Sequence, residues 1–163
     1  MKIQSLEQVL VEMQLVDDSG LDKAKSVQRE KALPLRDALL SAGVLSDHDL
    51  LQALARLWNI PLMNKIEEIE VDPSIVDVLP ITFLRKYTMV PVKLNADMME
   101  VAVNDPTDQE PLFDIAKILN IREITRVLAP KQEILKAINR LVEMKEEHAA
   151  DIMDDIEAEI GRA

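Results

Sequence analysis

The stretch LRDALLSAGVLSDHDLLQALARLW, residues 35–58, has the apolar spacing of two short amphipathic helices joined at a glycine. Apolar side chains recur on one face of each predicted helix: Leu35, Leu39 and Ala42 in the first, and Leu50, Leu51, Leu54 and Leu57 in the second. Gly43 follows the first helix, and glycine favours the left-handed conformation that commonly ends a helix. Ser46 or Asp47 can cap the second helix. The stretch therefore predicts a helical hairpin.

The same pattern occurs 29 residues earlier in the chain. At this single shift the coinciding pairs are Leu6 with Leu35, Leu10 with Leu39, Val11 with Leu40, Leu15 with Val44, Val16 with Leu45, Asp18 with Asp47, Leu21 with Leu50 and Ala24 with Ala53. Two unrelated amphipathic hairpins would share some of this spacing, but the run of coincidences favours a true repeat. We therefore expect residues 1–61 to form a tandem helical-hairpin repeat of about four helices.

The pattern changes after the first 61 residues, and residues 62–143 mix helical and strand-like segments. The predicted elements are a short helix between Pro73 and Pro80, a second helix ending near Tyr87, strands over 89–94 and 98–103 joined at residues 95–97, a helix opening at Thr107, a strand over 122–129, and a helix with Pro130 in its first turn. This order indicates a small α/β sandwich with a three- to four-stranded sheet and helices on one face. The fold class of the chain is accordingly α+β.

The remaining segment, residues 144–163, is strongly acidic. Ile152, Ile156 and Ile160 recur every four residues, as on one face of a helix. Its charge density and sparse apolar content nevertheless favour a flexible acidic linker over a helix.

Composition excludes several classes of function. The chain has 163 residues and a formal net charge of −11, which repels nucleic acid and anionic lipid. It contains no cysteine, so disulfides, thiolate metal sites and a cysteine nucleophile are excluded. The first residues, MKIQSLEQVL, do not form a signal peptide, and no segment approaches 18 consecutive apolar residues. We expect a soluble cytoplasmic protein without direct membrane insertion.

Catalytic chemistry is not indicated either. Gly20, Gly43 and Gly161 are the three glycines, and none precedes the Lys-Ser or Lys-Thr pair of a phosphate-binding Walker A loop. His48 and His148 lie far apart, and each is expected to be an exposed helix residue rather than a base or a metal ligand. No catalytic residue and no metal site are predicted.

Two longer segments together carry a resemblance to a known family. They are LRDALLSAGVLSDHDLLQALARLWNIPL, which begins at residue 35, and VDPSIVDVLPITFLRKYTMVPVKLNADMMEVAVNDPTDQEPLFDIAKIL, which begins at residue 71. The chain resembles, over about residues 5–142, the N-terminal region of type II secretion and type IV pilus assembly ATPases, known as the MshEN or secretion E-subunit N-terminal domain. The acidic tail is similar to the linker that leads to the ATPase core in secretion E subunits. The resemblance implies a hexameric parent that binds ATP and Mg²⁺ in that core and not in this fragment.

Members of this family that bind cyclic di-GMP carry two copies of a motif, which here falls on residues 5–28 and 34–57. The positions that match it, and that would bind the nucleotide by resemblance, are Leu6, Leu10, Val11, Gln28, Leu35, Leu39, Leu40 and Gly43. Its polar and glycine positions mostly differ: Ser5 and Pro34 replace arginine, Glu7 and Arg36 replace glycine, Gln14 replaces a later glycine, and Leu57 replaces glutamine.

The departures weaken nucleotide chemistry. Serine and proline lack the planar, charged donors with which arginine holds phosphate or guanine. A side chain in place of glycine hinders close approach of a ligand to the backbone, and Glu7 adds a carboxylate beside an anion. We expect the helical platform to be kept and its affinity for cyclic di-GMP to be weak or absent.

Two functions from different classes follow from the resemblance. The favoured one is a non-catalytic adaptor that docks a secretion ATPase onto the inner-membrane platform through the cytoplasmic domain of the type II secretion L subunit. The alternative is a cyclic di-GMP receptor module that regulates a pilus or secretion ATPase. In either case the protein would lie in the cytoplasm, peripheral to the inner membrane through its partners.

Arg85 and Lys86 are the candidate partner-binding residues. They lie side by side at the end of a predicted helix, in an otherwise acidic chain. Adjacent residues do not share one helix face, so at most one of them points at a given partner. A purely structural explanation is equally open, because cations stabilise the negative end of a helix.

Overall fold

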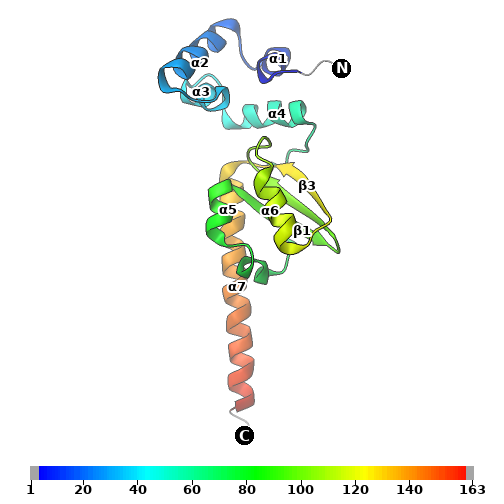
Figure 1. The fold of residues 1–163 in the computed structure, drawn as a ribbon. Coiled ribbons are helices and arrows are strands. Elements are labelled where there is room, and N and C mark those ends of the chain that lie inside the picture. Colours follow the sequence, from blue (N-terminus) through cyan, green and yellow to red (C-terminus); the bar gives the residue numbers. More distant parts are fainter. Residues whose placement is uncertain (1–3, 161–163) are drawn as a thin grey trace. The chain divides into compact units, whose positions relative to one another are not determined.

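The computed structural model describes residues 4–160 and divides into two compact units, Met1–Leu62 and Met63–Ala163 (Figure 1). Gly161 and the last residues of the predicted tail lie outside the described residues.

Unit 1 consists of helices joined by short turns. They are α1 (Leu6–Glu12), α2 (Asp18–Lys31), α3 (Leu35–Ser41) and α4 (Asp47–Trp58). Side chains cap three of them: Ser5 accepts from the Gln8 N–H, Asp17 from the Gly20 N–H, and Ser46 from the Asp49 N–H. Each cap satisfies a backbone donor that the first helical turn leaves free. Of the two residues expected to cap α4, Ser46 and Asp47, the structure uses Ser46.

The helices of unit 1 pack in two pairs across the repeat. α1 contacts α4, and α2 contacts α3. The buried side chains fall at equivalent positions of the two copies: Val9 and Ala38, Leu10 and Leu39, Leu21 and Leu50, Ala24 and Ala53. Helices α1 and α3 begin and end 29 residues apart, and α2 and α4 begin 29 residues apart. The predicted tandem helical-hairpin repeat is confirmed.

Unit 2 is an α+β unit built on a three-stranded mixed sheet, as predicted. Its elements are the 3-10 helix η1 (Pro73–Asp77), α5 (Ile81–Tyr87), β1 (Met89–Asn95), β2 (Met98–Val103), α6 (Glu110–Leu119), β3 (Glu123–Leu128) and α7 (Lys131–Ile160). The strand order is β1-β2-β3; β1 and β2 are antiparallel, and β2 and β3 are parallel. At the start of η1, a hydrogen bond from the Ser74 backbone N–H holds the pKa of the Asp72 carboxyl below its ordinary value of 3.8.

The sheet is covered on both faces at one end. Successive strand residues point to opposite faces, yet residues 89–92 of β1 and 101–103 of β2 are all buried. At this end both faces are therefore covered; α5 and α7 contact β1, and α6 contacts β3. At the other end Met98 and Glu123 are exposed and pair with each other, so one face is open there.

Helix α6 begins at Glu110 and not at Thr107, as the sequence had indicated. The reason lies in the preceding turn, where the Asp105 carboxylate accepts hydrogen bonds from the Thr107 N–H at 2.9 Å and from its hydroxyl at 2.6 Å. An aspartate that bonds the chain two residues ahead holds a turn rather than a helix. Asp105 thus delays the helix by about one turn.

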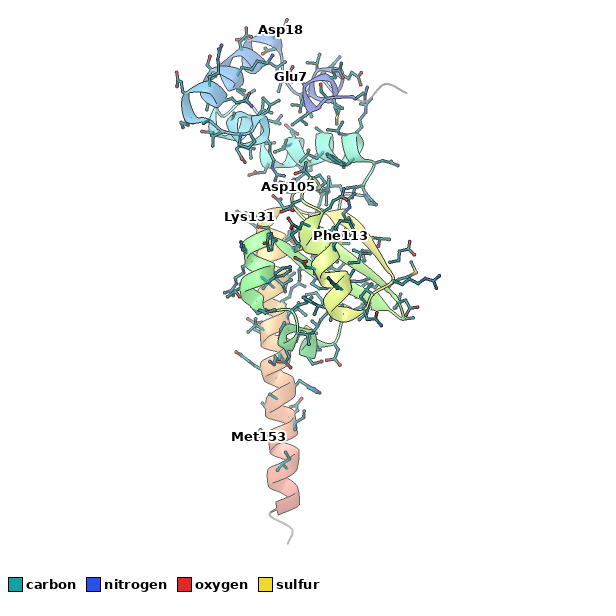
Figure 2. All side chains as sticks on the ribbon, in the orientation of Figure 1. Glu7, Asp18, Asp105, Phe113, Lys131 and Met153 are labelled. Carbon is teal, nitrogen blue, oxygen red and sulfur yellow. The ribbon has the colours of Figure 1, made fainter. Side chains whose placement is uncertain are left out.

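The acidic tail is helical rather than a linker through residue 160, because α7 continues into it without a break (Figure 1). No glycine or proline interrupts residues 131–160. Once a helix has formed, each further residue adds one backbone hydrogen bond without a new nucleation step. The first half of α7 buries Ile134, Ile138 and Leu141. Beyond it, Ile152 and Met153 are exposed; Met153 is labelled in Figure 2. Of the helices that the structure describes, none is long and apolar enough to cross a membrane.

Candidate functional site

The turn inside each hairpin of unit 1 has the same backbone geometry. Gln14 has a φ of 58° and Gly43 a φ of 69°, both in the left-handed region. The same hydrogen bonds close the two turns: Leu15 N–H to the Leu10 carbonyl at 3.0 Å, and Val44 N–H to the Leu39 carbonyl at 3.2 Å. At the first of these turns Gln14 stands where the motif has glycine, and the backbone there keeps the left-handed conformation.

The motif-matching residues lie partly in the core and partly at the surface. Leu10 and Leu39 are fully buried, so they build the platform and are not accessible to a ligand. Val11 is 46% exposed, and Gly43 is also exposed. The remaining four are half-buried: Leu6, Gln28, Leu35 and Leu40. The motif-matching residues of α1 lie on a helix that contacts α4, and those of α3 lie on a helix that contacts α2.

The side chain at the first lost glycine position is already paired. The Glu7 carboxylate lies 3.2 Å from the Lys25 Nζ, and Glu7 is labelled in Figure 2. Ser5, in place of the motif's arginine, forms a capping box with Gln8 at the start of α1. At its other end, α1 is linked to α4 by the pair of Glu12 and Arg56, at 3.4 Å. The cap and the ion pairs stabilise the helices. The Glu7 carboxylate adds a negative charge at a position where the motif has glycine.

A surface hollow of about 460 Å³ lies on α2, and it includes Gln28, the one polar residue that matches the motif. Lys25 and Arg29 line the same hollow, together with Asp22 and Ser26. Lys25 and Arg29 were not predicted as site residues, although their spacing of four residues places them on one face of the helix. The hollow therefore holds an amide and two cations beside one carboxylate, and one of the cations, Lys25, is already paired with Glu7.

Arg85 and Lys86 point to different neighbours in unit 2. The Arg85 Nη2 donates to the Asn139 Oδ1 of α7 at 3.1 Å. The Lys86 Nζ lies 5.1 Å from the centre of the Tyr87 ring, a cation–π contact within the chain. Both side chains remain exposed. Arg85 is thereby directed toward α7, whereas Lys86 stays over its own helix.

A second hollow, of about 470 Å³, lies beside Asn139 on α7. It is lined by three cations, Lys65, Lys136 and Arg140, with Glu133 and Glu143. Arg140 donates to the carbonyls of Ile66 and Glu67, and Glu133 accepts from the Ile66 N–H, which holds the 65–67 segment on α7. The cations come from distant parts of the sequence, so only the folded unit brings them together.

The part of the chain that the structure describes contains no cluster of His, Cys, Asp and Glu that could hold a metal ion. The arrangement offers surfaces and shallow hollows on helices. These features suit binding.

Comparison with known proteins gives a family and a fold. The family model described as the MshEN domain matches residues 58–148, more than half of the chain. The chain is 28% identical over 156 residues to the type IV pilus assembly ATPase PilB of Myxococcus xanthus (strain DK1622). The match covers 93% of this chain and 27% of PilB, so the chain spans about a quarter of the length of that relative.

Solved structures resemble the fold of this chain. A structure of MshE with cdg superposes with a TM-score of 0.71 at 26% identity, covering 85% of this chain and 99% of that one. The N-terminal domain of XpsE superposes with a TM-score of 0.64 at 20% identity, covering 86% and 98%. The second likeness is one of fold alone.

Proposed function

The chain belongs to the MshEN domain family, and on that premise we propose that it is the non-catalytic adaptor region of a type II secretion ATPase, which docks the motor onto its inner-membrane platform. The proposed partner is the cytoplasmic domain of the secretion L subunit. The ATPase core of the same parent, a hexamer, would be the second partner. The protein would then lie in the cytoplasm, peripheral to the inner membrane.

The observation that carries this proposal is the gathering of cations on unit 2 of an acidic chain. Arg85 bonds to Asn139, which lines the hollow that also holds Lys65, Lys136 and Arg140. Glu133, which pairs with Lys136 at 3.5 Å, and Glu143 line the hollow as well, so its cations exceed its carboxylates by one. In a chain of net charge −11, this local excess favours one orientation toward a partner that presents carboxylates. Charge pairs at an exposed rim contribute only about 0.2–1 kcal/mol each, so apolar contacts must supply most of the affinity.

The state of unit 1 supports an adaptor over a nucleotide receptor. Glu7 places a carboxylate at the motif position of a glycine and pairs with Lys25. Ser5 is engaged as a helix cap, and Gln14 adds a side chain at the second lost glycine. Each change removes a donor or narrows the approach to the backbone, while the buried leucines that hold the hairpins together are kept.

The test is a binding measurement between the full chain and the purified cytoplasmic domain of a type II secretion L subunit. We expect saturable binding whose association rate falls with added salt. The double charge reversal Arg85→Glu and Lys86→Glu should slow association. This measurement refutes the proposal if no binding is seen at concentrations up to about 100 μM, which is well above the dissociation constants of transient complexes of standard size.

The second candidate function is a cyclic di-GMP receptor that regulates a pilus or secretion ATPase. Two observations favour it: the structure of MshE with cdg is 26% identical to this chain, and the hollow on α2 brings Gln28 next to Lys25 and Arg29. Calorimetric titration with cyclic di-GMP separates the two functions. A dissociation constant in the low-micromolar range or below would favour the receptor.

A further inference from the structure

The outer edge of the sheet in unit 2 is formed by β3, which pairs with β2 on its inner side. Ala129, just after β3, donates its N–H to the Val103 carbonyl, whereas the Leu128 carbonyl accepts from the Met63 N–H on the outer side. Backbone groups alternate in direction along a strand. The N–H and C=O groups of Ile124 and Arg126 therefore point outward like those of Leu128. Within residues 4–160, neither residue has a backbone partner on that side.

A groove runs between this edge and α6. It has a volume of about 320 Å³, and α6 lines it with Leu112, Phe113 and Ala116. Ala116 follows Phe113 by three residues and Leu112 by four, so it neighbours both on the helix surface. The strand lines it with alternate residues, Ile124 and Arg126, preceded by Arg122. An open strand edge beside a helix is the geometry in which an extended peptide adds a strand and places alternate side chains in the groove.

The chemistry of the groove identifies the kind of segment that it fits. Phe113 is 68% exposed, the highest value among the large apolar side chains that the structure describes; it is labelled on α6 in Figure 2. It provides an apolar contact for one side chain of a guest strand. Arg122 is exposed, and Arg126 is half-buried, with its Nη1 donating to the Pro106 carbonyl at 2.8 Å. Two guanidinium groups along the groove of an acidic chain favour carboxylates on the guest.

We propose that the β3 edge and the α6 groove bind an extended segment of a partner protein, in which apolar and acidic residues alternate, as a fourth strand of the sheet. The backbone of the guest pairs with Ile124 and Arg126. Its apolar side chains contact Phe113 and Leu112, and a carboxylate meets Arg122. The proposal does not depend on Arg85, on the L subunit or on cyclic di-GMP.

The test uses the full chain and a synthetic capped hexapeptide in which glutamate and valine alternate. Calorimetry should show saturable binding, and amide NMR should show slowed hydrogen exchange at Ile124 and Arg126. A peptide with lysine in place of glutamate should bind at least about tenfold more weakly, because it reverses each charge contact. A glutamate peptide in which alternate backbone amides are N-methylated should not bind, because methylation removes the N–H donors that pair with the edge of β3.

Matched variants locate the site. Phe113→Ser should reduce affinity about tenfold, whereas Ile118→Ser, on the same helix and 53% exposed but outside the groove, should not. Arg122→Glu should reduce affinity about fivefold, whereas Lys117→Glu should not. All four side chains are exposed, so the fold should survive each change. No binding of the glutamate peptide, equal binding of the methylated one, or equal effects of Phe113→Ser and Ile118→Ser would overturn the proposal.

Discussion

Gln14 and Gly43 occupy the same place in the two hairpins and share a left-handed backbone, with φ values of 58° and 69°. The hydrogen bonds around them also match residue for residue at a shift of 29. Only one of the two residues is suited to this conformation, because a Cβ makes the left-handed region unfavourable by about 1 kcal/mol. The first hairpin therefore keeps a turn that its own sequence disfavours.

Gln14→Gly should stabilise the protein by about 0.5–1 kcal/mol, because glycine adopts the left-handed conformation without the steric cost of a Cβ. Gly43→Gln should destabilise it by a similar amount. Urea unfolding measures both changes. A Gln14→Gly variant less stable than the parent would mean that the glutamine side chain makes a stabilising contact that outweighs the backbone cost.

Gly20→Ala should destabilise unit 1, although alanine is the better helix former by about 1 kcal/mol. A Cβ at Gly20 would lie 2.9 Å from the Val44 Cγ1, closer than real Cβ contacts allow. We expect a net loss of about 1–2 kcal/mol from overpacking. Val44→Ala removes the Cγ1 atom that the new Cβ would meet. The double variant Gly20→Ala/Val44→Ala should therefore be destabilised by less than the sum of the two single changes, which a double-mutant cycle measures. Strictly additive effects would contradict the contact.

Cyclic di-GMP should bind the chain weakly, and Glu7→Gln should raise the affinity about threefold or more. The substitution removes a carboxylate next to an anionic ligand and frees Lys25, 3.2 Å away. Glu12→Gln is the control, because Glu12 lies on the same helix and pairs with Arg56 instead. Calorimetry on both variants checks the prediction. Equal effects of the two substitutions would speak for a general charge effect rather than a site at Glu7.

Charge reversal of Arg85 and Lys86 should slow association with a secretion L-subunit domain by about fivefold and flatten the salt dependence of the rate. The Arg85 variant should have the larger effect, because Arg85 is directed toward the basic hollow on α7 and Lys86 toward Tyr87. Lys23→Glu on α2 serves as the control for net charge. Stopped-flow rates that fall equally for all three variants would contradict a docking surface on unit 2.

Removal of residues 149–163 should change the unfolding free energy by less than about 0.5 kcal/mol while reducing the helical circular dichroism signal. Residues 149–153 and Ile156 are exposed, so their deletion removes little buried surface. Toward the end of its contact with unit 2, α7 pairs Lys145 with Asp77 and places His148 near the Asp72 carboxyl; both residues precede the deleted segment. A loss above about 1 kcal/mol would show that the extension packs against the unit.

Features fixed by neighbouring residues could be predicted from the sequence. The cap at Ser46 and the turn at Gly43 act within a few residues, so the sequence indicates both. The start of α6 was misplaced because the two hydrogen bonds of Asp105 to Thr107 outweigh the helical pattern. In the tail, charge density favours a linker and the isoleucine spacing a helix; no glycine or proline interrupts residues 131–160, and the helix already formed continues through them.

The candidate sites depend on distant residues, and these could not be predicted. Asn139 is paired with Arg85 across 54 positions of the sequence, and Arg140 holds residues 66 and 67. The groove at Phe113 requires the order of the strands, which leaves β3 at an edge. Apolar spacing indicates which residues form an element but not which elements become neighbours.

Exchanging the two copies of the repeat turns the pair of α1 and α4 into the pair of α3 and α2, which is the pairing expected of a pseudo-twofold arrangement, as in a dimer in which each half offers the other the same surface. The symmetry holds for the backbone and the core but is broken in charge, because the residue equivalent to Glu7 is Arg36. A cyclic dinucleotide has two identical halves. On this unit one half would meet a carboxylate where the other meets a guanidinium, so the symmetric ligand would find only half of a matching surface.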